Sequence, residues 1–148
     1  PPGWHGPTPE ELAGEPLRSR SPLKYAEAKA DFDGDGKEDH AALFTADDGK
    51  LEGLFVKLSS RHAREWLLAA QVEHRVPSMG VGMGIAVANP GRYETACAQG
   101  YGRPCGPGDP TEVTLKQAGI DYFRFESAGS LVYWHGTAHE FRRVWTSE

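Results

Sequence analysis

The sequence lacks any long apolar run and any excess of basic residues. Its longest apolar candidate, residues 80–88, is interrupted by glycines, whereas a membrane-spanning helix needs about 18 apolar residues. The formal net charge is −5, and the basic residues are scattered along the chain. Nucleic acids and anionic membranes both require a basic face on their partner. We therefore expect a soluble protein without a nucleic-acid partner or a membrane span.

Cysteine is scarce, because the chain has only Cys97 and Cys105, with seven residues between them in a stretch rich in glycine and proline. A disulfide closes such a spacing easily, whereas a metal site would need further thiols. Two free thiols of a cytosolic protein are the alternative. We favour the disulfide, and hence a periplasmic or secreted protein. The chain opens at Pro1 without an initiator methionine, which would fit a signal segment removed upstream.

The first 22 residues have little apolar material and hold six of the eleven prolines. We expect an extended or disordered arm, since such a segment cannot build its own core. One short helical turn is expected after Thr8, because threonine caps helices, Pro9 suits the first helical position, and the two glutamates that follow suit the helix dipole. Residues 23–148 are then expected to form a single β-rich domain.

From residue 23 onward, short segments of β-branched and aromatic residues alternate with turn residues, which predicts antiparallel strands. The expected strands are residues 24–30, 40–45, 54–58, 84–87, 93–97, 112–115, 121–126, 130–134 and 141–146. The segment 61–75 fits both a helix and a strand, and we favour a strand because its neighbours are strands. Aromatic residues of the last three strands are expected in the core. The predicted fold is a single-domain antiparallel sandwich or open barrel with an extended N-terminal arm.

One motif carries recognisable chemistry, the acidic loop from Asp31 to Asp39. Carboxylates stand at its positions 1, 3, 5 and 9, and glycine stands at position 6. Calcium takes roughly six to eight oxygen ligands, and this spacing can wrap one ion. The predicted ligands are the carboxylates of Asp31, Asp33, Asp35 and Asp39 and the backbone carbonyl of Lys37. A solvated hairpin without an ion is the alternative.

The loop is not an EF-hand, because position 12 is Ala42 where that motif has a glutamate, and no flanking helices are expected. Together with the apolar residues 41–44 that follow, it resembles the Asp-rich hairpin of FG-GAP and VCBS repeats, found in integrin-type propellers and bacterial surface proteins. The resemblance covers about residues 25–45 and implies a structural calcium ion. A propeller would need several copies, and the chain has one.

Other combinations of residues are weaker signals. His135 and His139 are four positions apart, and Gly136 and Thr137 between them indicate a hairpin turn and not a zinc site. The glycine-rich segment 78–84 lacks the features of a P-loop or a dinucleotide site, which favours a tight turn. Three carboxylates could serve glycoside hydrolysis only if the fold brings them together, and surface ion pairs are the simpler interpretation: Glu94, Asp121 and Glu126.

The last 60 or so residues carry a second resemblance. From Tyr93 the chain reads Tyr-Glu-Thr-Ala-Cys, followed by Gly100-Tyr101, by Phe-Glu-Ser-Ala at 125–128 and by the closing segment 141–148. This pattern is similar to small bacterial envelope proteins that accompany secreted cell-wall toxins as immunity proteins. The resemblance implies a periplasmic protein without catalysis of its own, which binds and blocks a secreted cell-wall-degrading toxin.

A disulfide-closed ring is preorganised, and tyrosine and arginine are the side chains that most often carry interface energy. We therefore predict Tyr101 and Arg103 in the ring as partner contacts, with the strand around Arg142 and Arg143 as a second surface. A ring that serves stability alone is the alternative.

The competing functional classes are a small calcium-dependent envelope hydrolase and a cell-surface or carbohydrate-binding module. An inhibitor predicts a rigid β-scaffold with a projecting loop, whereas a hydrolase predicts converging carboxylates or histidines. A cleft containing Glu94, Glu126 or His135 would favour the hydrolase.

Overall fold

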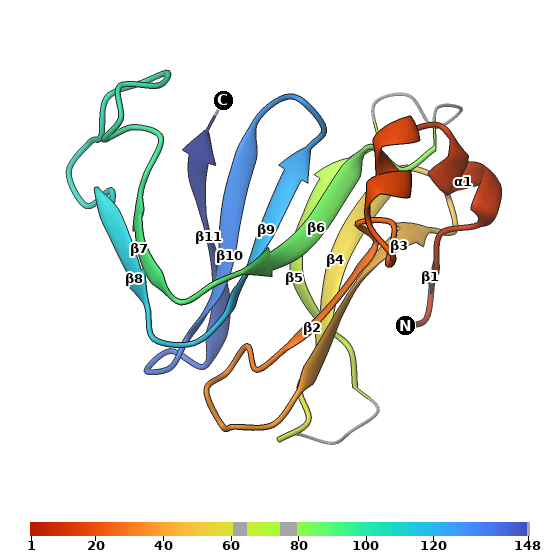
Figure 1. Cartoon of the computed structure of the whole chain (residues 1–148), viewed down its shortest axis with the longest axis horizontal. Coiled ribbons are helices and arrows are strands. Elements are labelled where there is room, and N and C mark those ends of the chain that lie inside the picture. Colours follow the sequence, from red (N-terminus) through yellow and green to blue (C-terminus); the bar gives the residue numbers. More distant parts are fainter. Residues whose placement is uncertain (61–64, 75–79, 148) are drawn as a thin grey trace.

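The computed structural model describes residues 1–60, 65–74 and 80–147. Antiparallel sheets form its framework (Figure 1). The first, which we call sheet A, has β3 at its centre, with β1 and β2 on one edge of β3, β4 on the other, and β5 beyond β4. Its strands are β1 (Trp4–His5), β2 (Glu27–Ala30), β3 (Asp39–Ala46), β4 (Leu51–Lys57) and β5 (Leu67–Glu73).

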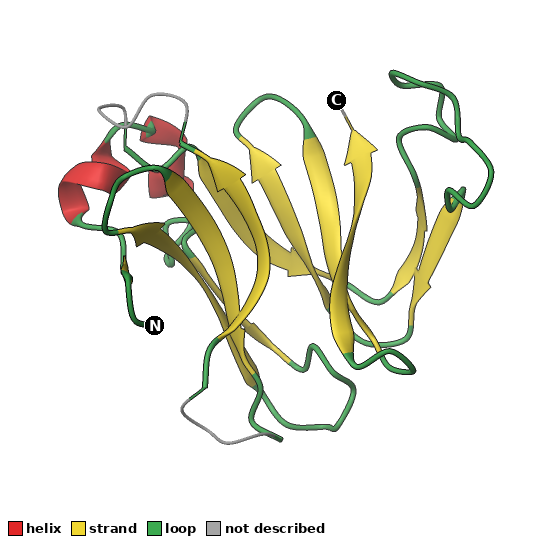
Figure 2. Cartoon of the chain, turned by 180° about the vertical axis from the view of Figure 1, so that it is seen from behind, coloured by secondary structure: helices red, strands yellow, loops and turns green. Residues whose placement is uncertain are grey.

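The second sheet, sheet B, has the strand order β11-β10-β9-β6, and a separate hairpin consists of β7 and β8. The strands of sheet B are β6 (Met83–Ala88), β9 (Gly119–Arg124), β10 (Gly129–His135) and β11 (Glu140–Ser147). The hairpin strands are β7 (Gly91–Glu94) and β8 (Glu112–Leu115). Sheet B lies between sheet A and the hairpin (Figure 2). The sheets do not close into a barrel, and the prediction of a mostly β, antiparallel sandwich is confirmed.

Each face of sheet B covers a separate apolar cluster, as expected from the two-residue period of a strand. The main core lies between the two sheets and includes Leu43 and Leu54 from sheet A and Ile120 and Tyr122 from sheet B. The smaller cluster lies under the hairpin and consists of Ala88, Val113, Leu115 and Leu131. The expectation that the late aromatic residues are core is wrong for Trp145, which is 49% exposed.

The observed strand ends differ from the predicted ones where the backbone turns. Lys24 and Tyr25 both have positive φ angles, so the strand predicted from residue 24 begins only at Glu27. Glu126 also has a positive φ angle, which ends β9 before it. The strand preference for segment 61–75 is confirmed for Leu67–Glu73, while residues 61–64 and 75 lie outside the described part of the chain.

The N-terminal residues were predicted to be extended, and this is wrong for most of them. The predicted turn at Thr8 is present as α1 (Pro9–Ala13) with a capping box, and η1 (Pro16–Arg20) follows it. Arg18 is 2% exposed and donates hydrogen bonds to the carbonyls of Lys24, Val81 and Met83. The segment folds because it docks on the main core and needs none of its own. Within the described residues, neither helix has the length and hydropathy to cross a membrane.

Candidate functional site

The acidic loop connects β2 to β3 and brings its four aspartates together. One carboxylate oxygen from each lies within 4.8 Å of the others, in the group Asp31, Asp33, Asp35 and Asp39. Gly34 and Gly36 both have φ +82°, a conformation that residues with a side chain rarely adopt. The two glycines therefore allow the loop to curl around its own carboxylates. This group could hold a metal ion.

Backbone amides of the loop hold the first aspartate in place. Asp31 accepts hydrogen bonds from the amides of Gly34, Asp35 and Gly36. The Lys37 amide donates to the side chain of Asp35, whereas the role of the Lys37 carbonyl as a ligand stays a prediction. Hydrogen bonds within the loop thus hold its carboxylates in an inward-facing arrangement without the help of an ion.

Asp39 anchors the other end of the loop from a buried position, where it is 2% exposed. It accepts hydrogen bonds from the Phe32 amide and from the amide and hydroxyl of Ser59. Phe32 itself is part of the main core. The loop is consequently fastened to the sandwich at both ends, and its conformation depends on the fold.

The carboxylates of the loop are not electrostatically equivalent. Burial acts to raise the pKa of Asp31, but the amides of Gly36, Gly34 and Asp35 outweigh it, and the pKa lies below its ordinary value. Burial raises the pKa of Asp33, and the neighbouring charge of Asp39 adds to this effect, while Ser60 opposes it. A cation would relieve this crowding of negative charge.

Residues distant in sequence complete the surroundings of the loop, and they were not predicted. The hydroxyl of Ser60, after β4, donates a hydrogen bond to Asp33 at 2.7 Å. The side chain of Gln117, after β8, lies against Gly34. Neither position carries a signal in the sequence, because serine and glutamine are common in loops and only tertiary folding brings them here.

The second candidate site is the ring closed by the disulfide between Cys97 and Cys105, a pairing that was predicted. The ring is fastened to the edge strand β11. The Ala96 amide donates to the Trp145 carbonyl at 2.7 Å, and the Gln99 side chain donates to the Thr146 carbonyl at 3.1 Å. The strand predicted at 93–97 ends at Glu94, and beyond this end the Ala96 amide bonds to β11 instead.

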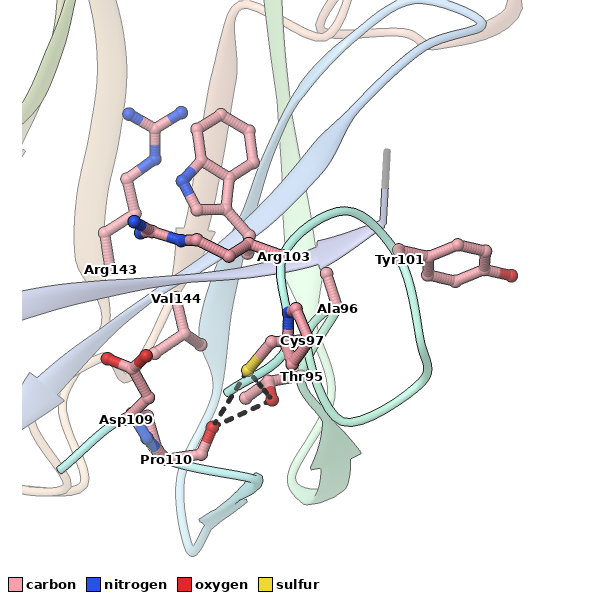
Figure 3. Close-up of a pocket in the computed structure, with 11 residues that line it drawn as sticks. Thr95, Ala96, Cys97, Tyr101, Arg103, Asp109, Pro110, Arg143 and Val144 are labelled. Atoms are coloured by element: carbon pink, nitrogen blue, oxygen red, sulfur yellow. Dashed lines mark hydrogen bonds between the residues drawn. The ribbon is translucent and has the colours of Figure 1, made fainter. Parts of the chain in front are cut away.

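A pocket of about 380 Å³ lies between the ring and β11, and we call it the ring pocket (Figure 3). Arg103 of the ring and Arg143 of β11 both line it. The side chain of Arg103 extends across the pocket, whereas the ring of Tyr101 points away from Arg143 (Figure 3). Tyr101 is 48% exposed and therefore forms the outer rim.

The structure separates the two neighbouring arginines of β11. Arg142 is exposed and makes an ion pair with Glu140 at 3.3 Å. Arg143 is half-buried, lines the ring pocket, and stacks over Tyr122 and Trp145. Of the four predicted partner residues, three thus border one pocket, and Arg142 does not line it.

Comparisons with family models, curated proteins and solved structures found no match. Glu94, Glu126 and His135 do not line the ring pocket. His135 is the last residue of β10, before the predicted hairpin turn, and its Nδ1 accepts a hydrogen bond from the Ala138 amide in that turn. Burial of Asp121 raises the pKa of its carboxyl group, and Asp121, like Glu94 and Glu126, is not among the residues that line the ring pocket.

One polar cluster in the core escaped the sequence analysis. Glu52 is 1% exposed and accepts hydrogen bonds from the amides of Gly82 and Met83. His74 lies 3.1 Å from the other Glu52 oxygen. A signal was present, because Glu52 is in phase with the core residues Leu54 and Val56 of β4. In its described part, residues 80–84, the glycine-rich segment is therefore a tight connection whose backbone amides pack on a buried carboxylate.

Proposed function

We propose that this chain is a non-enzymatic, extracytoplasmic binding protein that inhibits a secreted cell-wall-degrading toxin. The observation that carries the proposal is the ring pocket, in which the disulfide-closed ring and β11 present Arg103 and Arg143 side by side with an exposed Trp145. Arginine and tryptophan are enriched among the residues that dominate protein interfaces. A ring held by a disulfide and by hydrogen bonds to β11 loses little entropy when a partner docks.

The proposal includes a structural calcium ion in the acidic loop. Four carboxylates gather within 4.8 Å, and hard oxygen ligands of this kind suit calcium. The loop is anchored by Asp39 and Phe32 to the sandwich, so an ion there stabilises the scaffold and takes no part in a reaction. The disulfide supports a periplasmic or secreted location, since such bonds persist in oxidising compartments.

The proposal is tested with a purified secreted cell-wall hydrolase encoded beside the gene for this chain. We expect the chain to inhibit its hydrolysis of purified peptidoglycan at equimolar concentration. The double variant Tyr101→Ala/Arg103→Ala should keep its melting temperature and lose about 30-fold in affinity, the equivalent of about 2 kcal/mol at a hot spot. Arg142→Ala is the matched control and should bind normally.

Two results would overturn the proposal. One is release of sugar or peptide fragments from peptidoglycan by this chain alone, which would make it an enzyme. The other is undiminished hydrolysis in the presence of excess chain. If inhibition occurs but the folded double variant binds normally, the interface lies elsewhere on the molecule.

A further inference from the structure

A second cavity, of about 300 Å³, lies at the open edge between the two sheets, and we call it the edge cavity. Here β5 is the last strand of sheet A and β11 the last strand of sheet B, and the two strands approach one another. Its lining comes from β5, β6, β9, β11 and the turn before β10: Val72, Glu73, Met83, Arg124, Ala128, Arg143 and Trp145. The cavity therefore contains two arginines that are distant in sequence.

The guanidinium of Arg143 is held firmly but is incompletely satisfied. Its Nε donates to the hydroxyl of Ser130 at 2.9 Å, and its Cζ lies 4.9 Å from the ring centre of Tyr122 and 4.4 Å from that of Trp145. Its Nη2 atom is buried and has no hydrogen-bond partner among the described residues. A buried donor without a partner costs free energy, so this atom is available to an acceptor that enters the cavity.

Arg124 adds a second positive charge to the same cavity. Within residues 1–60, 65–74 and 80–147, neither Arg124 nor Arg143 forms a salt bridge, and Glu73 in the lining pairs with neither. Burial lowers the pKa of Arg143, and the charge of Arg124 acts in the same direction. The buried carboxylate of Glu52 is already engaged with backbone amides and His74. A carboxylate from outside would relieve the repulsion and satisfy the free donors.

The edge cavity adjoins the ring pocket, because Arg143 and Trp145 line both. Arg143 and Trp145 thus form a wall that the two cavities share, with Arg103 in the ring pocket and Arg124 in the edge cavity. The two linings together hold three arginines and two carboxylates, Glu73 and Asp109, which is a positive balance in a chain with a net charge of −5. Trp145, 49% exposed between them, offers an apolar surface for the stem of a side chain. The two cavities together fit an extended segment better than a single small anion.

We infer that the edge cavity and the ring pocket form one docking track for an acidic peptide segment, whose carboxylates bind Arg124, Arg143 and Arg103. This inference rests on the proposed function, since it specifies what the protein partner presents. It predicts a partner with consecutive acidic residues in an exposed loop or terminus. Electrostatic complementarity of this kind increases the association rate and selects the partner.

The probe is a capped hexaglutamate peptide, with capped hexaglutamine and inorganic phosphate as comparisons, at low ionic strength. Binding is followed by the NMR shift of the Trp145 indole N–H, assigned with Trp145→Phe. Arg124→Gln and Arg103→Gln should each weaken hexaglutamate binding about tenfold, the loss expected for a charge-assisted hydrogen bond. Arg142→Gln is the matched control on the same strand and should bind within about twofold of the wild type.

Three results would overturn the inference. They are absence of hexaglutamate binding, equal binding of hexaglutamine, and unchanged binding by a folded Arg124→Gln variant. Phosphate binding that depends on Arg124 without hexaglutamate binding would show a small-anion site and would also overturn the acidic segment. The peptide experiment contains no toxin, so its failure leaves inhibition of a hydrolase untouched, and loss of inhibition leaves the peptide result standing.

Discussion

Arg142 and Arg143 are adjacent in β11, yet Arg142 makes an exposed ion pair with Glu140 while Arg143 lies over the buried ring of Tyr122. Successive side chains of a strand point to opposite faces, so one arginine is directed to solvent and the other into the space between the sheets. The same residue type therefore has two different roles at neighbouring positions.

This difference should be measurable as stability. Arg143→Ala removes two ring contacts and the hydrogen bond to Ser130, and we expect the free energy of unfolding to fall by about 1–2 kcal/mol. Arg142→Ala should change it by less than about 0.5 kcal/mol, because exposed ion pairs contribute little. Urea denaturation of the two variants gives both values. Equal effects of the two substitutions would contradict the assigned role of Arg143.

Calcium should stabilise the fold through the acidic loop. If the dissociation constant is about 10⁻⁴ M, the weak end of known sites, calcium at about 10 mM adds about 2.7 kcal/mol to the free energy of unfolding. The melting temperature should then rise by about 5–10 °C relative to chelator. Asp33→Ala should abolish the rise. Glu38→Ala removes one negative charge from the same loop but leaves the four clustered aspartates in place. This variant should therefore keep the calcium-dependent rise in melting temperature.

The disulfide should stabilise the chain as well as shape the ring pocket. On the chain-entropy model, opening so short a ring costs about 2–3 kcal/mol of stability. We expect this loss for Cys97→Ala/Cys105→Ala in thermal or urea denaturation. Intact-mass measurement of the wild type should show uptake of two alkyl groups after reduction and none before it. Alkylation of the unreduced protein would contradict the pairing.

The N-terminal segment should be held most strongly in mildly acidic solution. His5 lies 2.8 Å from Asp47 and 3.1 Å from Glu11. The Asp47 carboxylate raises the pKa of His5 above its ordinary 6.5, against the effect of burial and with help from Glu11. Burial acts to raise the pKa of Glu11, but the Thr8 amide and His5 outweigh it and hold the pKa below its ordinary 4.5.

The direction of the pH dependence follows from these two shifts. The contribution of His5 is complete below pH 6.5 and is lost as the pH rises through its higher folded pKa. The contribution of Glu11 is complete above pH 4.5 and is lost as the pH falls through its lower folded pKa. The stability difference between wild type and His5→Gln should therefore be largest between pH 4.5 and 6.5. A stability difference that stays constant with pH across this range and on both sides of it would contradict the ion pairs assigned to His5.

The amino-acid sequence by itself determined the local features. Alternating apolar residues predicted most strands, because a strand directs every second side chain to the same face. The spacing of Asp31, Asp33, Asp35 and Asp39 predicted their convergence, since the glycines between them allow the backbone to curl around the carboxylates. The pairing of Cys97 with Cys105 was also predictable, because the two thiols are close along the chain.

Only the tertiary structure decided which distant residues meet. Arg103 and Arg143 were predicted on separate candidate surfaces, whereas in the structure the Ala96 amide bonds to the Trp145 carbonyl and both arginines line one pocket. Arg18 is buried and does not lie in an extended arm as predicted, because backbone carbonyls of distant segments accept its hydrogen bonds. Arg124 carried no signal, because only the pairing of β9, β10 and β11 in sheet B brings it to the same cavity as Arg143. Such contacts depend on how the sheets stack, and local periodicity contains no information about stacking.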